Sequence, residues 1–171
     1  DEAYAEYVES RDYPQTIEYV KEGKNVIVLR TFSKIYGLAG LRVGYGFAKK
    51  EIIDVLEKVR QPFNVNLLAQ AGAIAALDDA KHVAKSVMLN NEGKQYFEKL
   101  FIEMGITYIP THTNFILIDL KKDAKKITRF LLEKGIIVRQ IGGPTCIRVT
   151  IGTKEQNERF AAALGEAVKK I

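Results

Sequence analysis

The sequence predicts an α/β protein in two parts, in which a larger α/β part is followed by a smaller α/β (α+β) part at the carboxyl end. A β-branched run at 25–29 leads straight into a glycine-rich loop, the order found where a strand leaves an open α/β sheet. Helical spacing of apolar residues dominates as far as residue 104, and short strand patterns begin after residue 106. The 171 residues are 47% hydrophobic, so the chain has material for a sizeable core.

The start of the chain is expected to form one short helix and two strands. Apolar spacing predicts the helix over 15–21. The run 25–29, NVIVL, is typical of a strand that is buried on both faces. Residues 42–48 alternate enough between apolar and other side chains to form the second strand.

Two helices of different character are expected next. Residues 50–59 have an amphipathic pattern. Residues 67–77 are alanine-rich and apolar nearly all round, which predicts a buried helix. Between them the segment 61–66, QPFNVN, breaks the pattern, and Asn64 or Asn66 is a candidate cap for the second helix.

Residues 80–104 show helical spacing with a polar middle, and Asp79 is placed to cap this stretch. The pattern allows two interpretations. Either one long helix bridges the two parts of the chain, or Gly93 divides two shorter helices.

After Gly105 the pattern is that of a small sheet covered by helices. Asp123 is expected to cap one helix, and Thr153 with Gln156 forms a capping box for the last one. Four short strands are expected, over 108–109, 114–120, 136–139 and 146–151.

Composition excludes several classes of protein. No run approaches the roughly 20 apolar residues of a membrane helix, and we expect neither a membrane span nor a signal peptide. Cys146 is the only cysteine, which excludes an internal disulfide and favours a reducing, cytoplasmic location. His82 and His112 lie far apart in the sequence, so no metal site is expected.

The net charge of +5 raises the question of nucleic acid. The lysines occur as scattered pairs near predicted helix ends, where solvated cations are ordinary. No basic stripe is interleaved with aromatic residues. We therefore expect no nucleic-acid partner, although a non-catalytic binding module with a basic surface stays open as an alternative.

The stretch 31–45, TFSKIYGLAGLRVGY, carries the candidate chemistry. Ser33 offers a hydroxyl beside the amine of Lys34, and Arg42 supplies a planar fork suited to phosphate. Glycines let the loop fold tightly around a ligand. One lysine beside one phosphate site suggests pyridoxal phosphate, which needs an amine for a covalent link and separate groups for its phosphate.

The pattern Thr-x-Ser-Lys-x-x-Gly-Leu-Ala-Gly-Leu-Arg-x-Gly-Tyr resembles the Schiff-base motif of fold-type I aminotransferases, and in particular the histidinol-phosphate aminotransferase family. The resemblance implies pyridoxal 5'-phosphate bound covalently to Lys34, with Ser33 and Arg42 on its phosphate. The opening DEAY resembles a segment in which Asp1 would face the pyridine nitrogen and Tyr4 the 3-oxygen of the ring.

The resemblance also implies the substrates, histidinol phosphate and glutamate or 2-oxoglutarate, and a homodimer. Arg148 would grip the carboxylate or phosphate of the substrate, and Arg139 would lie near the substrate phosphate. The segment 63–66, FNVN, is a mark of the histidinol-phosphate group within the family. A related pyridoxal enzyme, such as a threonine-phosphate decarboxylase or an aromatic aminotransferase, stays open as an alternative.

By the same resemblance, residues 1–79 would be a remnant of the large cofactor-binding domain, 80–105 a single linking helix, and 106–171 the small carboxyl-terminal domain. The amino-terminal half of the family pattern is not visible, so we expect a fragment. We expect this chain alone to bind the cofactor weakly or not at all, to be inactive, to expose a sheet edge, and to leave Asp1 disordered.

Overall fold

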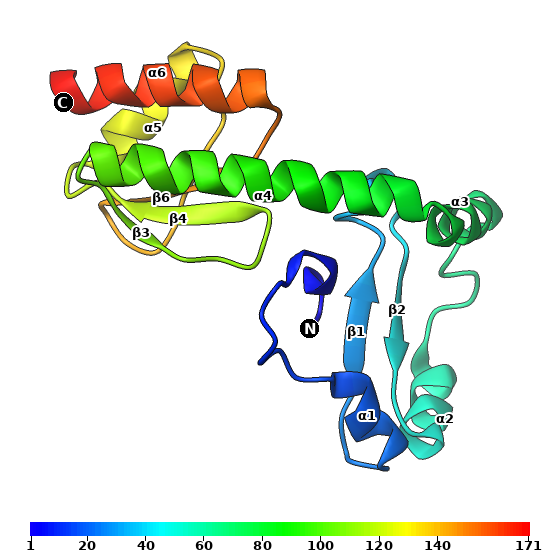
Figure 1. Ribbon diagram of the computed structural model, residues 1–171. Helices are drawn as coiled ribbons and strands as arrows, with labels where there is room; N and C mark the ends of the chain where they lie inside the picture. Colours follow the sequence, from blue (N-terminus) through cyan, green and yellow to red (C-terminus); the bar gives the residue numbers. More distant parts are fainter. The chain divides into compact units, whose positions relative to one another are not determined.

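The chain folds into two units, residues 1–86 and 87–171, in a computed structural model that describes all 171 residues (Figure 1). The boundary lies inside the long helix α4 (Ala80–Glu103). No helix combines the length and apolar character that crossing a bilayer requires.

Unit 1 is built around a two-stranded antiparallel sheet. Its elements are the 3-10 turn η1 (Ala5–Tyr7), α1 (Thr16–Lys21), β1 (Val28–Thr31), the 3-10 turn η2 (Ala39–Leu41), β2 (Gly44–Phe47), α2 (Lys50–Val59) and α3 (Leu67–Asp78). The helices predicted over 15–21 and 50–59 are confirmed to within one residue, and the second strand is confirmed.

The expectation that the first strand is buried on both faces is wrong. Val28 is buried, but Ile27 is 42% and Leu29 50% exposed. A strand is buried on both faces only when other elements cover each face, and β1 pairs with β2 alone. Within unit 1, packing covers one side of this hairpin and leaves apolar side chains on the other.

The expectation that 67–77 forms a buried helix is also wrong. The helix is present as α3, but only Ala69 and Ala73 are buried in it. Leu67 and Leu68 are each 78% exposed, and Ile74 is 66% exposed. The apolar composition predicts the helix correctly, but burial depends on neighbours that unit 1 does not supply.

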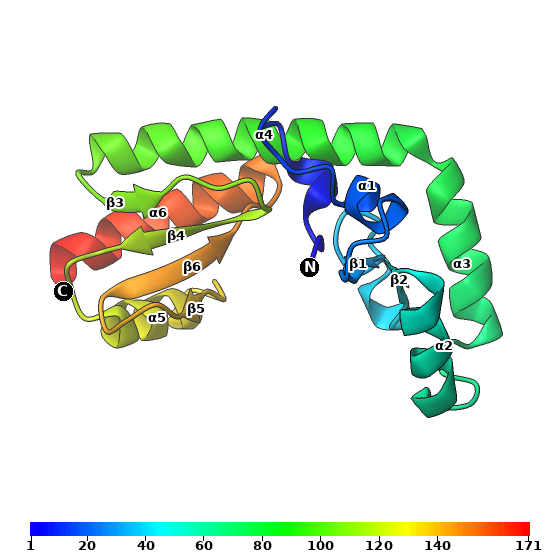
Figure 2. The same cartoon turned by 90° about the horizontal axis from the view of Figure 1, so that it is seen from below.

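Unit 2 is a four-stranded antiparallel sheet with strand order β3-β4-β6-β5. With the greater part of α4, its elements are β3 (Thr107–Ile109), β4 (Phe115–Asp119), α5 (Ala124–Glu133), β5 (Arg139–Gln140), β6 (Cys146–Thr150) and α6 (Lys154–Lys170). Side chains alternate along β4 and β6, so one face of the sheet packs against the helices (Figures 1 and 2). The core on that face includes Phe97, Phe101, Ile116, Ile118, Ile127, Leu131, Ile147, Val149, Phe160 and Leu164.

The strand predicted over 136–139 is largely wrong, because β5 contains only Arg139 and Gln140. The preceding residues close α5 instead. Gly135 has φ +71°, and the Ile136 N–H donates to the carbonyl of Leu131 at 2.9 Å. A backbone donor that caps a helix cannot also pair with a neighbouring strand.

Local capping signals, in contrast, are confirmed. Asn66 caps α3 and Asp123 caps α5 through their side-chain oxygens. The Asp79 carboxylate accepts from a backbone N–H in the first turn of α4 at 3.0 Å. Thr153 and Gln156 form the predicted capping box of α6. Each of these signals needs only residues three positions apart, so tertiary packing does not change it.

The long stretch forms one continuous helix, which confirms the first of the two interpretations. Gly93 is buried within α4 and does not break it. A Cβ at this position would clash with Cγ2 of Ile151 and would lie 2.9 Å from Nδ2 of Asn157. The glycine therefore serves close packing of α4 against the start of α6.

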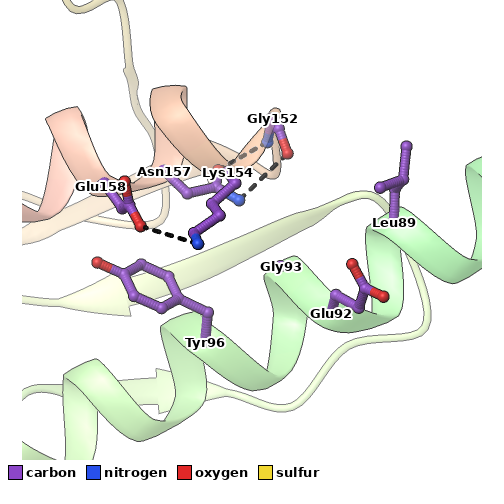
Figure 3. A pocket seen from close by; sticks show the side chains of 8 residues that line it. All are labelled: Leu89, Glu92, Gly93, Tyr96, Gly152, Lys154, Asn157 and Glu158. Carbon is purple, nitrogen blue, oxygen red and sulfur yellow. Dashed lines mark hydrogen bonds and ion pairs between the residues drawn. The ribbon is translucent and has the colours of Figure 1, made fainter.

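Figure 3 shows the shallow hollow beside this contact, between α4 and α6. Four of the residues that line it pair with one another. The Asn157 side chain accepts from the Gly152 N–H at 2.8 Å and donates to its carbonyl at 3.1 Å, and Lys154 pairs with Glu158 at 3.9 Å. The hollow is a packing seam between two helices.

Candidate cofactor and anion sites

A buried carboxylate fixes the amino-terminal segment beside β1. The Glu2 N–H donates to the Leu29 carbonyl at 2.8 Å. The Glu2 side chain is 5% exposed and accepts from Thr16 Oγ1 at 2.6 Å, Arg30 Nε at 2.9 Å and the Tyr13 hydroxyl at 3.3 Å. Four hydrogen bonds therefore hold the residue next to Asp1.

Burial alone would raise the pKa of Glu2. The hydrogen bonds from Thr16 and Arg30, together with the charge of Arg30, outweigh burial, so the pKa of this carboxyl is lowered from its ordinary value of 4.5. Glu2 is consequently an anion at neutral pH. The attachment of the amino-terminal segment depends on that charge.

The candidate lysine lies on a tight turn directly after β1. The Gly37 N–H donates to the Lys34 carbonyl at 2.9 Å, and Gly37 has φ +71°, a left-handed conformation that favours glycine. The Lys34 side chain is exposed, and its Nζ lies 5.3 Å from the centre of the Tyr4 ring. The amino-terminal segment thus brings the predicted phenol next to the predicted amine.

Ser33 and Arg42 meet because of the register of the hairpin. Thr31 pairs with Gly44, and the same register continued past the strand ends places Ser33 across from Arg42. Arg42 Nη1 donates to Ser33 Oγ at 3.3 Å and to the Ala39 carbonyl at 2.7 Å. Arg42 adopts φ +52°, an uncommon conformation for a residue with a Cβ.

Close approach of the two strands depends on Gly44. A Cβ there would lie 2.8 Å from the Arg30 carbonyl oxygen, closer than real side-chain carbons come to backbone. The glycine lets the pairing continue to Phe32, whose N–H donates to the Val43 carbonyl at 3.2 Å. Phe32 and Val43 are buried and tie the loop to the core of unit 1.

The two candidate arginines of unit 2 are cross-strand partners. Arg139 on β5 pairs in register with Arg148 on β6. Arg139 is exposed, and Arg148 is half-buried. Both lie on the face of the sheet opposite the helices, because the neighbours of Arg148 along β6, Ile147 and Val149, point into the core. We call this the helix-free face.

Arg148 is held by an aromatic ring and by no carboxylate. Its guanidinium carbon lies 4.6 Å from the centre of the Phe115 ring, within the range of a cation–π contact. Its Nε is buried and has no hydrogen-bond partner. Like charges directly opposite one another on a sheet are unfavourable, so the Arg139–Arg148 pair is best satisfied by an anion.

The structure therefore groups the predicted site residues in three pairs within the units. These are Ser33 with Arg42, Lys34 with Tyr4, and Arg139 with Arg148. Asp1 is exposed, and its Oδ1 accepts from the Ala3 N–H at 3.0 Å.

Sequence reasoning missed Glu2 and Phe115. Glu2 follows the recognised aspartate directly, but its partner Arg30 is 28 residues away, a separation for which periodicity carries no signal. Phe115 belongs to an apolar strand pattern and gave no sign of a cation beside it.

Comparison with known proteins identifies the family to which the chain is similar. A family model described as aminotransferase class I and II matches residues 1–164. Histidinol-phosphate aminotransferase of Moorella thermoacetica is 56% identical over 170 residues, a match that covers 97% of this chain and 44% of that protein. The corresponding protein of Bacillus licheniformis is 52% identical over 168 residues, covering 96% of this chain and 46% of that protein.

A solved structure extends the likeness to the fold. The crystal structure of histidinol-phosphate aminotransferase from Sinorhizobium meliloti in complex with pyridoxal-5'-phosphate matches with a TM-score of 0.91 and 33% sequence identity. The match covers 99% of this chain and 48% of that one, so the predicted α/β fold is confirmed. The chain spans about half the length of the curated relatives it matches. Since the family model covers nearly the whole sequence, the chain belongs to the class I and II aminotransferases.

Proposed function

We propose that this chain supplies active-site residues of a histidinol-phosphate aminotransferase, which moves an amino group between histidinol phosphate and 2-oxoglutarate with pyridoxal 5'-phosphate, as part of histidine biosynthesis. One observation carries the proposal. The amine of Lys34 lies on the same turn as the Ser33 hydroxyl, which accepts a hydrogen bond from the Arg42 guanidinium. The identity to curated histidinol-phosphate aminotransferases supports the choice of substrate.

The donor set fits the cofactor. Ser33 and Arg42 are a hydroxyl and a cation 3.3 Å apart without a carboxylate partner, a combination suited to a phosphate. Lys34 has no ion pair, so its amine is available for covalent attachment. When bound, the cofactor supplies an electron sink that stabilises negative charge on the substrate carbon.

Lys34 has a second role in this proposal. Its amine would act as a general base that takes the proton from the amino-bearing carbon of the substrate, and then as a general acid that delivers this proton to the cofactor carbon. Tyr4, beside Lys34, is assigned to the 3-oxygen of the cofactor ring. Asp1 is assigned to the ring nitrogen, where a carboxylate favours the protonated form.

Arg148 and Arg139 are assigned to the anionic groups of the substrate. Two guanidiniums on adjacent strands present several N–H donors to one face, and neither is neutralised by a carboxylate. This arrangement supports binding of the carboxylate or phosphate of the substrate by Arg148, with Arg139 near the substrate phosphate. A threonine-phosphate decarboxylase or an aromatic aminotransferase would use Lys34 and Arg42 in the same way, so the substrate assay decides between them.

The wider context is proposed on the same basis. We assign 1–79 to the cofactor-binding domain, 80–105 to the linking helix and 106–171 to the small domain, in a cytoplasmic homodimer. The exposed apolar side chains of α3 support a further surface that covers unit 1 in the active enzyme. Taken alone, the chain is expected to bind the cofactor weakly or not at all and to be inactive.

Selective labelling tests the cofactor assignment. A longer protein that contains this chain is mixed with pyridoxal 5'-phosphate, reduced with borohydride and digested, and the label on each lysine peptide is quantified by mass spectrometry. We expect label to concentrate on Lys34 and to disappear there in Lys34→Ala, while the control Lys24→Ala keeps it. Equal labelling of Lys34 and other exposed lysines contradicts the proposal. Turnover of histidinol phosphate by a longer protein that contains this chain tests the substrate.

A further inference from the structure

The helix-free face of unit 2 has a feature that the assignment of Arg148 does not itself explain. Phe115 lies on β4 across from Thr150, so Arg148 is its diagonal neighbour two residues back along β6. Diagonal cross-strand positions are within reach of aromatic and long side chains. The ring and the guanidinium carbon are 4.6 Å apart.

The nearby carboxylate on this face already has a partner within the chain. Asp119, on the same strand as Phe115, pairs with Lys121 at 2.5 Å and accepts from the Lys121 N–H at 3.0 Å. A carboxylate on Arg148 would occupy the in-plane N–H donors that an anionic ligand needs. An aromatic ring that lies against the face of a guanidinium leaves the donors at its edge free.

We propose that Phe115 is a positioning residue that holds the guanidinium plane of Arg148 so that its N–H donors face an anionic ligand. The inference rests on the proposed role of Arg148 in anion binding. The Nε of Arg148 is buried and has no hydrogen-bond partner, so no protein acceptor holds this part of the guanidinium in place of the ring. The Phe115 ring attracts the cation without presenting a carboxylate to its donors.

The test uses the whole chain and inorganic phosphate as the probe. The Nε–H resonance of Arg148 is followed by ¹⁵N NMR and assigned by its loss in Arg148→Lys. Phe115→Leu removes the ring and keeps an apolar side chain of similar size, and Phe115→Tyr keeps the ring as the matched control. Thermal unfolding of each variant verifies that the fold is retained.

We expect the resonance in the unmodified chain to shift with phosphate. In Phe115→Leu the phosphate dissociation constant should rise about 2- to 30-fold, the range for losing a cation–π contact at a partly buried site. The Nε–H resonance should also broaden or move, and Phe115→Tyr should behave as the unmodified chain. A merely structural role for Phe115 would not move the Arg148 resonance selectively.

Two results overturn the inference, and they are distinguishable. A folded Phe115→Leu variant with an unchanged Nε–H resonance and an unchanged dissociation constant refutes positioning by Phe115, while the role of Arg148 stands. A resonance in the unmodified chain that does not respond to phosphate refutes the role of Arg148 in anion binding, and the inference falls with it.

Discussion

The attachment of the amino-terminal segment through Glu2 gives the most informative prediction, because this segment carries Asp1 and Tyr4. Glu2→Gln keeps the shape of the side chain and removes its charge. Hydrogen bonds to a charged group contribute more than neutral ones by about 1 kcal/mol each. Glu2 accepts three side-chain bonds, and Arg30 is 31% exposed, which screens part of its share. We therefore expect a loss of about 1–3 kcal/mol in docking of the segment.

Hydrogen exchange of the Glu2 amide measures this loss, because its N–H is bonded to the Leu29 carbonyl only while the segment is docked. A loss of this size speeds exchange about 5- to 150-fold at neutral pH. Thr16→Val, which removes one hydrogen bond and no charge, serves as the matched control and should have a smaller effect.

The pH dependence follows from the lowered pKa of Glu2. A carboxyl whose pKa is lower in the folded state stabilises that state above its unfolded pKa, and the stabilisation is lost as the pH falls through the folded value. Protection of the Glu2 amide, corrected for intrinsic exchange, should therefore fall as the pH drops below 4.5. Glu2→Gln should lack this dependence. Equal protection in Glu2→Gln and the unmodified chain at neutral pH would refute the reasoning.

Two glycine substitutions test close packing in each unit. Gly93→Ala should destabilise unit 2 by about 2 kcal/mol in urea unfolding, because the new Cβ clashes with Ile151. The control Gly165→Ala lies in open space on α6 and should be neutral or stabilising by up to about 1 kcal/mol. A Gly93 variant at least as stable as the Gly165 variant would contradict the packing argument. Gly44→Ala should push the paired strands apart and reduce labelling of Lys34 by pyridoxal phosphate several-fold. In the control Gly40→Ala the new Cβ meets nothing within 4 Å, and labelling should stay intact. Equal labelling of both variants would show that close approach of the strands does not matter.

Much of the secondary structure could be predicted because its signals are local. The caps at Asn66, Asp123 and Thr153 involve residues three positions apart or fewer, and the structure contains each of them. The pairing of Ser33 with Arg42 could also be predicted, since both belong to one glycine-rich hairpin whose register brings them together.

Burial and distant partners could not be predicted in the same way. The apolar patterns of β1 and α3 indicated burial, yet Leu29 and Leu67 are exposed because exposure depends on which other elements cover them. The bond between Glu2 and Arg30 joins residues 28 positions apart, and the stack of Phe115 on Arg148 depends on the register of two strands. Neither arrangement has a periodic signature in the sequence.

The central claim is that Lys34 carries the cofactor while Ser33 and Arg42 hold its phosphate, and the phosphate itself provides the most direct test. Within a longer protein that contains this chain, labelling of Lys34 is compared between pyridoxal 5'-phosphate and pyridoxal, which has the same aldehyde and no phosphate, for the unmodified chain and for Arg42→Ala. The account predicts a clear preference for the phosphate ester that Arg42→Ala removes. Equal labelling by the two aldehydes in the unmodified chain, or a preference that survives in Arg42→Ala, would contradict it.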